Sequence, residues 1–210
     1  MSQDIEQLKQ QVRAARVIPV LVLDDVSRAR PLAEALVAGG LNVLEVTLRT
    51  PNALAVMAEM ARVEGAIVGS GTVRHATHMR QSEDAGCRFM VSPGAPAYLL
   101  EDAQSVSIPL LPGVGSPTEA MAAARQGYSF LKFFPAEALG GVRVLKAFMS
   151  PLSDLEFCPT GGISPENMGT YLSLSNVVCV GGSWVAPVDL VQKGDFKAIE
   201  RLARAAREGG

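Results

Sequence analysis

A single lysine lies inside an almost wholly apolar run, "FLKFFPAEALGG", at residues 130–141. An unpaired charge in an apolar setting is costly, so lysine is among the residues least often fully buried. Side chains two positions apart share one face of a strand, which places Lys132 with Phe130 and Phe134, opposite Leu131 and Phe133. If Leu131 and Phe133 face helices, Lys132 points into the mouth of a site. Desolvation disfavours a charged amine, and a neutral amine can attack a ketone to form an imine. A lysine whose ammonium reaches solvent at the strand end is the alternative.

A second segment, "EVTLR" (45–49), places a carboxylate and a guanidinium on one face of another expected strand. Imine chemistry needs a group that moves protons, and Glu45 is the best placed carboxylate for that role. The planar fork of Arg49 suits bidentate binding of a substrate carboxylate. A local ion pair between Glu45 and Arg49 is the alternative interpretation.

Two glycine pairs follow apolar runs late in the chain, in "PTGG" (159–162) and "GGS" (181–183). Glycine lets backbone N–H groups approach a ligand closely, and a following helix N-terminus favours an anion. The expected phosphate-binding residues are Thr160, Gly161, Gly162, Gly182 and Ser183. Turn formation alone is the alternative for each pair. Together with Lys132 and Arg49, these loops predict a 2-keto acid with a terminal phosphate as the substrate.

Short β-branched runs alternate with helical segments along the chain, at a spacing of about 20–30 residues. The expected strands cover residues 16–23, 42–48, 66–72, 87–92, 107–114, 128–134, 156–162 and 176–182, after an N-terminal helix at 1–15. Eight such units predict an α/β fold, a single (β/α)8 TIM barrel over residues 1–210. A doubly wound open sheet is the runner-up, but no GxGxxG turn follows the first strand. Active sites of such barrels form at the C-terminal strand ends, where the residues above fall.

The composition narrows the partners and the location. The chain is 48% hydrophobic with a formal net charge of −2 and has no basic block, so nucleic acid is not expected as a partner. No apolar run approaches the roughly 18 residues that span a bilayer. The opening "MSQDIEQLKQQ" lacks the apolar core of a signal peptide, which predicts a cytoplasmic protein.

The metal-binding and nucleophilic residue types show no convergent motif. Cys87, Cys158 and Cys179 are far apart and odd in number, as in a protein with reduced thiols. His75 and His78 could share a metal at i and i+3 of a helix, but a solvated helix face is the favoured reading. There is no HExxH, CxxC or GxSxG motif, so we expect neither a metal nor a serine nucleophile. Imine formation on a lysine needs no cofactor either.

An ordered set of motifs runs through the chain: "ALVAGGLNVLEVTLRT", "IVGSGTV", "VSPG", "FLKFFPAE", "FCPTGGISPEN" and "CVGGSW". On these motifs the chain resembles the 2-keto-3-deoxy-6-phosphogluconate (KDPG) aldolases. These are class I aldolases of the Entner–Doudoroff pathway, also called 2-keto-4-hydroxyglutarate (KHG) aldolases. The resemblance implies an eight-stranded barrel, usually a homotrimer. It also implies that Lys132 is the Schiff-base lysine and Glu45 the general acid/base.

The resemblance assigns further site residues, motif by motif. Arg49, Thr72 and Pro93 match positions that line the pyruvate end of the pocket, and Phe134 matches a pocket aromatic. The residues that match the phosphate-binding loops are Thr160, Gly161, Gly162 and Ser183. Two departures bear on substrate preference: Ser70 stands where the family more often has alanine, and the loop 113–116 differs from the common form.

The predicted reaction is cleavage of KDPG to pyruvate and D-glyceraldehyde 3-phosphate, with cleavage of 4-hydroxy-2-oxoglutarate to pyruvate and glyoxylate as a second candidate activity. KDPG, its galactonate epimer and the unphosphorylated hydroxyglutarate all stay open as the preferred substrate. Two alternatives come from other classes of protein. A pyridoxal-phosphate barrel protein also uses a lysine imine and a phosphate cup. In a non-catalytic sugar-phosphate-binding barrel, Lys132 would only pair with a ligand anion.

Overall fold

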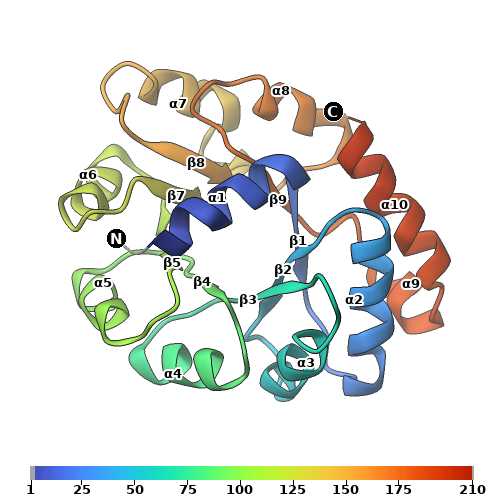
Figure 1. The fold of residues 1–210 in the computed structure, drawn as a ribbon. Helices are drawn as coiled ribbons and strands as arrows, with labels where there is room; N and C mark the ends of the chain where they lie inside the picture. The colour runs from blue at the N-terminus through green and yellow to red at the C-terminus, as the bar shows by residue number, and fades with distance from the viewer. Residues whose placement is uncertain (1–2, 210) are drawn as a thin grey trace.

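The computed structural model describes residues 3–209, which form a ring of strands surrounded by helices (Figure 1). The strands are β1 (Val17–Leu21), β2 (Val43–Thr47), β3 (Ile67–Gly71), β4 (Phe89–Val91), β5 (Leu110–Leu111), β6 (Gly113–Val114), β7 (Phe130–Phe133), β8 (Glu156–Pro159) and β9 (Val180–Gly182). Their pairings are parallel, as strands joined through crossover helices require.

The strands close into a barrel. Six of them pair in the order β5-β4-β3-β2-β1-β9 and three in the order β6-β7-β8. β5 and β6 lie on either side of Pro112, which has no N–H to donate to a neighbouring strand. Bridges from Phe157 to Val177 and from Thr160 to Gly181 join β8 to β9 and complete the ring. The predicted (β/α)8 barrel is therefore confirmed, with the expected strand 107–114 interrupted at its proline.

Helices surround the strands on all sides (Figure 1). They are α1 (Gln3–Ala15), α2 (Ala29–Ala38), α3 (Ala53–Met60), α4 (Ala76–Asp84), α5 (Ala97–Asp102), α6 (Pro117–Arg125), α7 (Gly141–Phe148), α8 (Pro165–Leu172), α9 (Val188–Lys193) and α10 (Phe196–Glu208). Three 3-10 turns accompany them, η1 (Val26–Arg28), η2 (Ala103–Ser105) and η3 (Glu137–Leu139). The predicted N-terminal helix is present as α1.

The two faces of the strands bury side chains in two separate clusters. Leu131 and Phe133 belong to the outer cluster, between strands and helices, with Leu44 and Val46 of β2. Phe130 belongs to the inner cluster, inside the barrel. The alternation predicted for β7 and β2 is thus confirmed. Phe130 takes the same face as Lys132, as expected, but it packs in the barrel interior rather than at the mouth.

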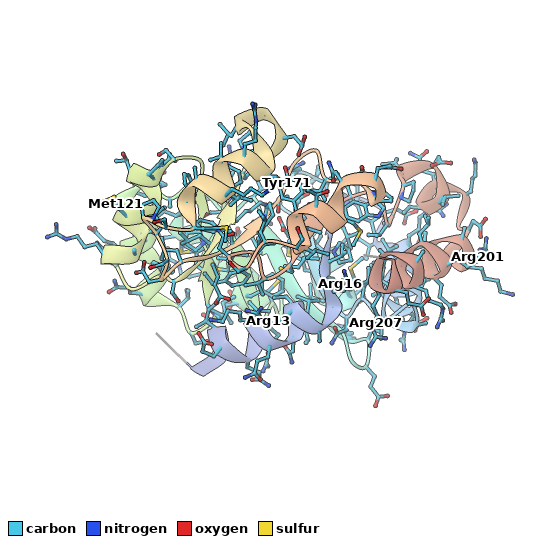
Figure 2. The ribbon with its side chains drawn as sticks, turned by 90° about the horizontal axis from the view of Figure 1, so that it is seen from above. Arg13, Arg16, Met121, Tyr171, Arg201 and Arg207 are labelled. Carbon is cyan, nitrogen blue, oxygen red and sulfur yellow. The ribbon has the colours of Figure 1, made fainter. Side chains whose placement is uncertain are left out.

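Helix α1 covers one end of the barrel. It lies across the ring in Figure 1 and below the strands in Figure 2, and Ile5, Leu8 and Val12 extend the inner cluster. Glu156 at the start of β8 accepts hydrogen bonds from Lys9 at 2.8 Å and Arg13 at 2.5 Å. Since these contacts are made where β8 begins, α1 lies at the N-terminal strand ends and leaves the C-terminal ends open.

Candidate active site

Lys132 and Glu45 meet inside the barrel. Lys132 lies on β7 and Glu45 on β2, 87 residues apart, and Nζ lies 3.2 Å from Oε1. The residues are only 4% and 2% exposed. Each charge therefore compensates the burial of the other, because an isolated buried charge is far more costly than a paired one. The alternative of an ammonium that reaches solvent is wrong.

Phe134 is the aromatic residue beside the amine. Its ring centroid lies 5.3 Å from Nζ of Lys132, within the roughly 6 Å at which a cation is attracted to a ring face. Phe134 follows β7 at the C-terminal end and also lines a hollow of about 350 Å³ together with Pro93 and Gly113. The structure thus brings the predicted residues Phe134 and Pro93 to one opening.

Glu45 has room for its carboxylate because β3 carries glycine at two inward positions. A Cβ atom on Gly71 would lie 2.3 Å from Oε1 of Glu45, and one on Gly69 would lie 2.3 Å from the ring of Phe89. Neither glycine has a positive φ, so space and not backbone conformation requires them. Sequence reasoning assigned no role to Gly71. The signal that could have found it is a pair of glycines at i and i+2 of a strand, which places both on one face.

Arg49 lies two residues beyond the C-terminal end of β2, four residues after Glu45, and contacts the segment that follows β3. Its Nε donates to Oγ1 of Thr72 at 3.2 Å. Thr72 has a φ of +63°, an uncommon conformation for a residue with a Cβ. Within residues 3–209 Glu45 forms its ion pair with Lys132, so the predicted local alternative between Glu45 and Arg49 is wrong. The exposed guanidinium keeps further donors for a ligand.

The loop after β8 presents free backbone N–H groups. Gly161 and Gly162 have φ values of +101° and +81°. The carbonyls of Thr160, Gly161 and Gly162 accept hydrogen bonds from Ala136 N (2.9 Å), Glu137 N (3.1 Å) and Asn167 Nδ2 (3.0 Å). The N–H groups of Gly161, Gly162 and Ile163 donate to no acceptor in the described part of the chain. A run of unpaired N–H groups of this kind suits an anion.

The loop after β9 lies beside it, because Thr160 pairs with Gly181. Gly181 is required by this contact, since a Cβ atom there would lie 2.3 Å from Oγ1 of Thr160. Gly182 is required by packing, since a Cβ atom would overlap the ring of Trp184. Ser183 follows on the surface. All the predicted phosphate-binding residues therefore lie at two adjacent loops at the C-terminal strand ends.

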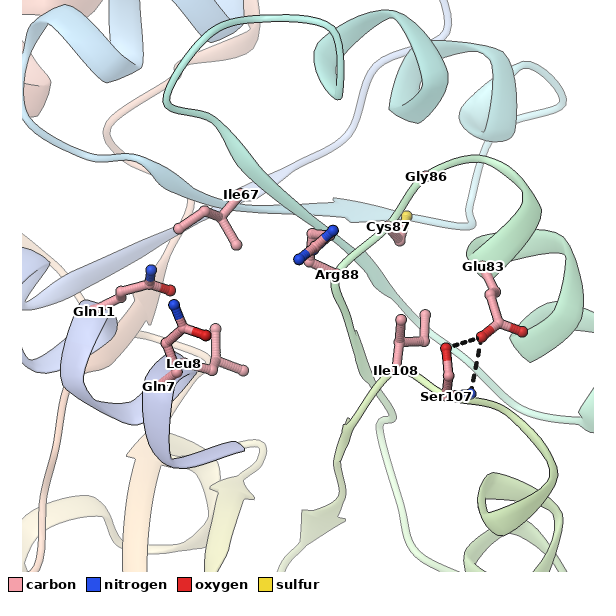
Figure 3. A pocket seen from close by; sticks show the side chains of 10 residues that line it. All are labelled: Gln7, Leu8, Gln11, Ile67, Glu83, Gly86, Cys87, Arg88, Ser107 and Ile108. Atoms are coloured by element: carbon pink, nitrogen blue, oxygen red, sulfur yellow. Dashed lines mark hydrogen bonds between the residues drawn. The ribbon is translucent and has the colours of Figure 1, made fainter. Parts of the chain in front are cut away.

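A second cavity, of about 400 Å³, lies at the opposite end of the barrel, between α1 and the segments before β4 and β5 (Figure 3). Its carboxylate, Glu83, is already held by Ser107, whose hydrogen bonds lower the pKa of Glu83. Burial raises the pKa of Cys87 to about 12, so this thiol is a poor nucleophile at neutral pH. No lysine lines this cavity, and the pair of Lys132 and Glu45 lies elsewhere, inside the barrel.

The histidines and cysteines, the other residues that could bind a metal or act as nucleophiles, form no such site in the described residues. His75 caps α4, with Nδ1 accepting from the N–H of His78 at 3.4 Å, and the centroids of the two rings lie 3.7 Å apart with the rings tilted by 39°. Across residues 3–209, no group of three or more His, Cys, Asp or Glu side chains is placed to hold a metal. The three cysteines are buried free thiols. In the same residues, no helix is both long and apolar enough to cross a membrane.

The fold and the pair define a class, a (β/α)8 barrel with a buried lysine set against a carboxylate for imine chemistry. Comparison with known proteins agrees. The sequence model of the family "KDPG and KHG aldolase" matches residues 8–202. The chain belongs to this family.

Several relatives and solved structures carry the same description. The chain is 52% identical over 194 residues to the 2-dehydro-3-deoxy-phosphogluconate aldolase of Pseudoalteromonas atlantica, covering 92% of this chain and 90% of that protein. It is 48% identical to the KHG/KDPG aldolase of Escherichia coli K12, covering 92% and 91%. The KDPG aldolase of Legionella pneumophila, captured with pyruvate as a covalent carbinolamine intermediate, superimposes with a TM-score of 0.92 at 42% identity, covering 98% of both chains.

Proposed function

We propose that this protein is a class I aldolase that cleaves KDPG to pyruvate and D-glyceraldehyde 3-phosphate. The observation that carries the proposal is the buried pair of Lys132 and Glu45, 3.2 Å apart. A lysine at this depth needs a compensating partner, and the partner present is a carboxylate that can accept its proton. The names of the relatives and the carbinolamine trapped in the Legionella enzyme support the same chemistry.

In the proposed mechanism, Glu45 accepts a proton from Nζ of Lys132, and the amine attacks the C2 carbonyl. Glu45 returns protons as the carbinolamine loses water to give the protonated imine. Glu45 next takes the proton of the C4 hydroxyl, the C3–C4 bond breaks, and its electron pair moves to the imine nitrogen to give an enamine. Glyceraldehyde 3-phosphate leaves at this step. Protonation at C3 and hydrolysis of the imine release pyruvate and restore the amine.

The two ends of the substrate bind at different loops. Arg49, which is held in place by its hydrogen bond to Thr72, binds the substrate carboxylate. Pro93 and Phe134 line the pyruvate end. The phosphate binds at the loops after β8 and β9. The residues assigned to it are Thr160, Gly161, Gly162, Gly182 and Ser183. The unpaired N–H groups of the first loop support this assignment.

Cleavage of 4-hydroxy-2-oxoglutarate is a second proposed activity, supported by the name of the Escherichia coli relative, which carries both substrates. This substrate has the same 2-keto acid end and lacks the phosphate, so it uses Lys132, Glu45 and Arg49 without the glycine loops. Comparing kcat/KM for KDPG, its galactonate epimer and 4-hydroxy-2-oxoglutarate, with pyruvate release as the readout, ranks the three.

Borohydride reduction in the presence of pyruvate tests the mechanism. One pyruvate-derived group should be found on the peptide that carries Lys132, and activity should survive a chelator. A label on another lysine, or no label, contradicts the assignment. A purified protein with an internal-aldimine absorption band would favour the pyridoxal-phosphate alternative. Full activity of Lys132→Arg would favour the binding-protein alternative, because arginine keeps the charge and forms no imine.

We propose a cytoplasmic homotrimer in which each chain is one barrel domain over residues 1–210. Val22 and Val188 are exposed apolar side chains that line one surface hollow, and an assembly of copies that covers this hollow would remove them from water. Light scattering of the purified protein should give three times the mass of one chain. A mass equal to one chain contradicts the trimer.

A further inference from the structure

The segment "PAEALGG" after the lysine strand takes no part in the mechanism above, yet it is tied to the loop that presents free N–H groups. The N–H groups of Ala136 and Glu137 hold the carbonyls of Thr160 and Gly161, at 2.9 and 3.1 Å. The space over Gly162 is filled by the side chain of Glu137, whose Cγ would lie 2.5 Å from a Cβ atom on that glycine. The turn after β7 therefore forms the support on which the β8 loop rests.

The carboxylate of Glu137 is in turn held by α8. The hydroxyl of Tyr171 donates to Oε1 of Glu137. Tyr171, labelled in Figure 2, is fully buried. Burial, together with the hydrogen bond to Glu137, raises its pKa, so the hydroxyl stays protonated and remains a donor. Gly141 makes the contact possible, since a Cβ atom there would lie 2.5 Å from the Tyr171 hydroxyl oxygen. Its φ of +57° also favours glycine.

We infer that Glu137 and Tyr171 are positioning residues that hold the Gly161–Gly162 loop with its N–H groups toward the ligand, and that this pair sets the preference for a phosphorylated over an unphosphorylated 2-keto acid. The inference rests on the proposed function. Glu137 fixes the loop at two points, through its own N–H on Gly161 and through its side chain against Gly162. Without Tyr171 the side chain is free to rotate, and the loop loses one support.

The experiment uses steady-state kinetics of the full chain with KDPG and with 4-hydroxy-2-oxoglutarate. Tyr171→Phe and Glu137→Ala should each raise KM for KDPG about tenfold, the usual effect of losing one hydrogen bond to a charged group. Neither variant should change kcat/KM for 4-hydroxy-2-oxoglutarate, and borohydride trapping of pyruvate should proceed as in the wild type. Glu137→Gln should keep the wild-type KM, because its amide oxygen can still accept from Tyr171.

Tyr128→Phe is the matched control, because Tyr128 is a half-buried tyrosine outside this contact; it should behave as the wild type with both substrates. Equal losses with the two substrates in Tyr171→Phe would overturn the inference and leave a purely structural role. Unchanged kinetics in both Tyr171→Phe and Glu137→Ala would also overturn it, as would a Glu137→Gln variant as impaired as Glu137→Ala. Failure of the proposed function is distinct, because the wild type itself would then cleave neither substrate.

Discussion

A substitution at Gly71 of β3 tests how the carboxylate of Glu45 is held in place. In Gly71→Ala, the new methyl group would lie 2.3 Å from Oε1 of Glu45 and 2.8 Å from its Cγ. Ordinary contact begins near 3.4 Å, so the carboxylate must move by roughly 1 Å. That movement acts directly on the 3.2 Å contact with Lys132. A misplacement of about 1 Å typically costs about a hundredfold in rate, so kcat should fall by about that factor.

Ser70→Ala is the matched control on the neighbouring residue. Ser70 is buried, and its Oγ has no hydrogen-bond partner in the described part of the chain, so alanine removes an unsatisfied group and adds no atom. It should keep the wild-type kcat and be at least as stable.

Pyruvate release gives kcat, and urea unfolding reports whether Gly71→Ala is folded, with a stability loss of about 1–3 kcal/mol for overpacking. A folded Gly71→Ala variant with kcat within about threefold of the wild type would refute the close contact between Gly71 and a catalytic Glu45, since the expected misplacement effect is far larger.

Two further predictions concern the buried pair and the docking of α1. Glu45→Gln keeps the shape of the side chain but removes the base, so kcat should fall by about 10²–10⁴, and loss of the buried counter-charge should destabilise the fold by about 3–5 kcal/mol in urea unfolding. Activity close to the wild type would remove Glu45 from the proton transfers. Burial acts to raise the pKa of Glu156, but the hydrogen bonds from Lys9 and Arg13 outweigh it and hold the pKa below the ordinary 4.5. The contact therefore stabilises the protein above that pH and is lost as the pH falls through the lowered folded-state pKa. The Tm of the wild type should drop more steeply below pH 4.5 than that of Glu156→Gln, and parallel curves would contradict this.

Much of the barrel could be predicted from the sequence because its periodicities are strong. Strands buried on both faces and helices that end at glycine recur at a nearly constant spacing, and this pattern defines the topology. The interruption of the fifth strand was missed, although Pro112 was visible. The missing N–H of proline prevents pairing only toward one neighbour, while its carbonyl still accepts from the N–H of Lys132 at 2.9 Å. Which neighbour is lost depends on the register, and the register is a property of the assembled sheet.

In the site too, some features could be predicted from the sequence and others depend on how the strands pair. Alternation along each strand correctly placed Lys132 and Glu45 inside the barrel, because it needs only the period of a strand. It could not decide whether Glu45 would pair with Arg49 or with Lys132. Arg49 lies two residues beyond the end of β2 and donates to Thr72, which directly follows β3, so this contact depends on the pairing of β2 with β3. The role of Gly71 also depends on that pairing, since it becomes evident only when β3 lies beside Glu45.

The ion pair changes the physical account of the lysine. From the sequence, with only aromatic neighbours in view, desolvation is the expected reason for an uncharged Lys132 amine. The structure instead gives Lys132 a carboxylate at 3.2 Å and one nearby ring, with Phe130 deeper in the barrel. Within the described part of the chain Glu45 is the ion-pair partner of Lys132, so a carboxylate that can accept the proton of the amine lies at hydrogen-bond distance. The group that makes the lysine tolerable in the interior is therefore the group that can free its lone pair for attack. The reactivity proposed for Lys132 therefore depends on the space that Gly71 leaves for the carboxylate of Glu45.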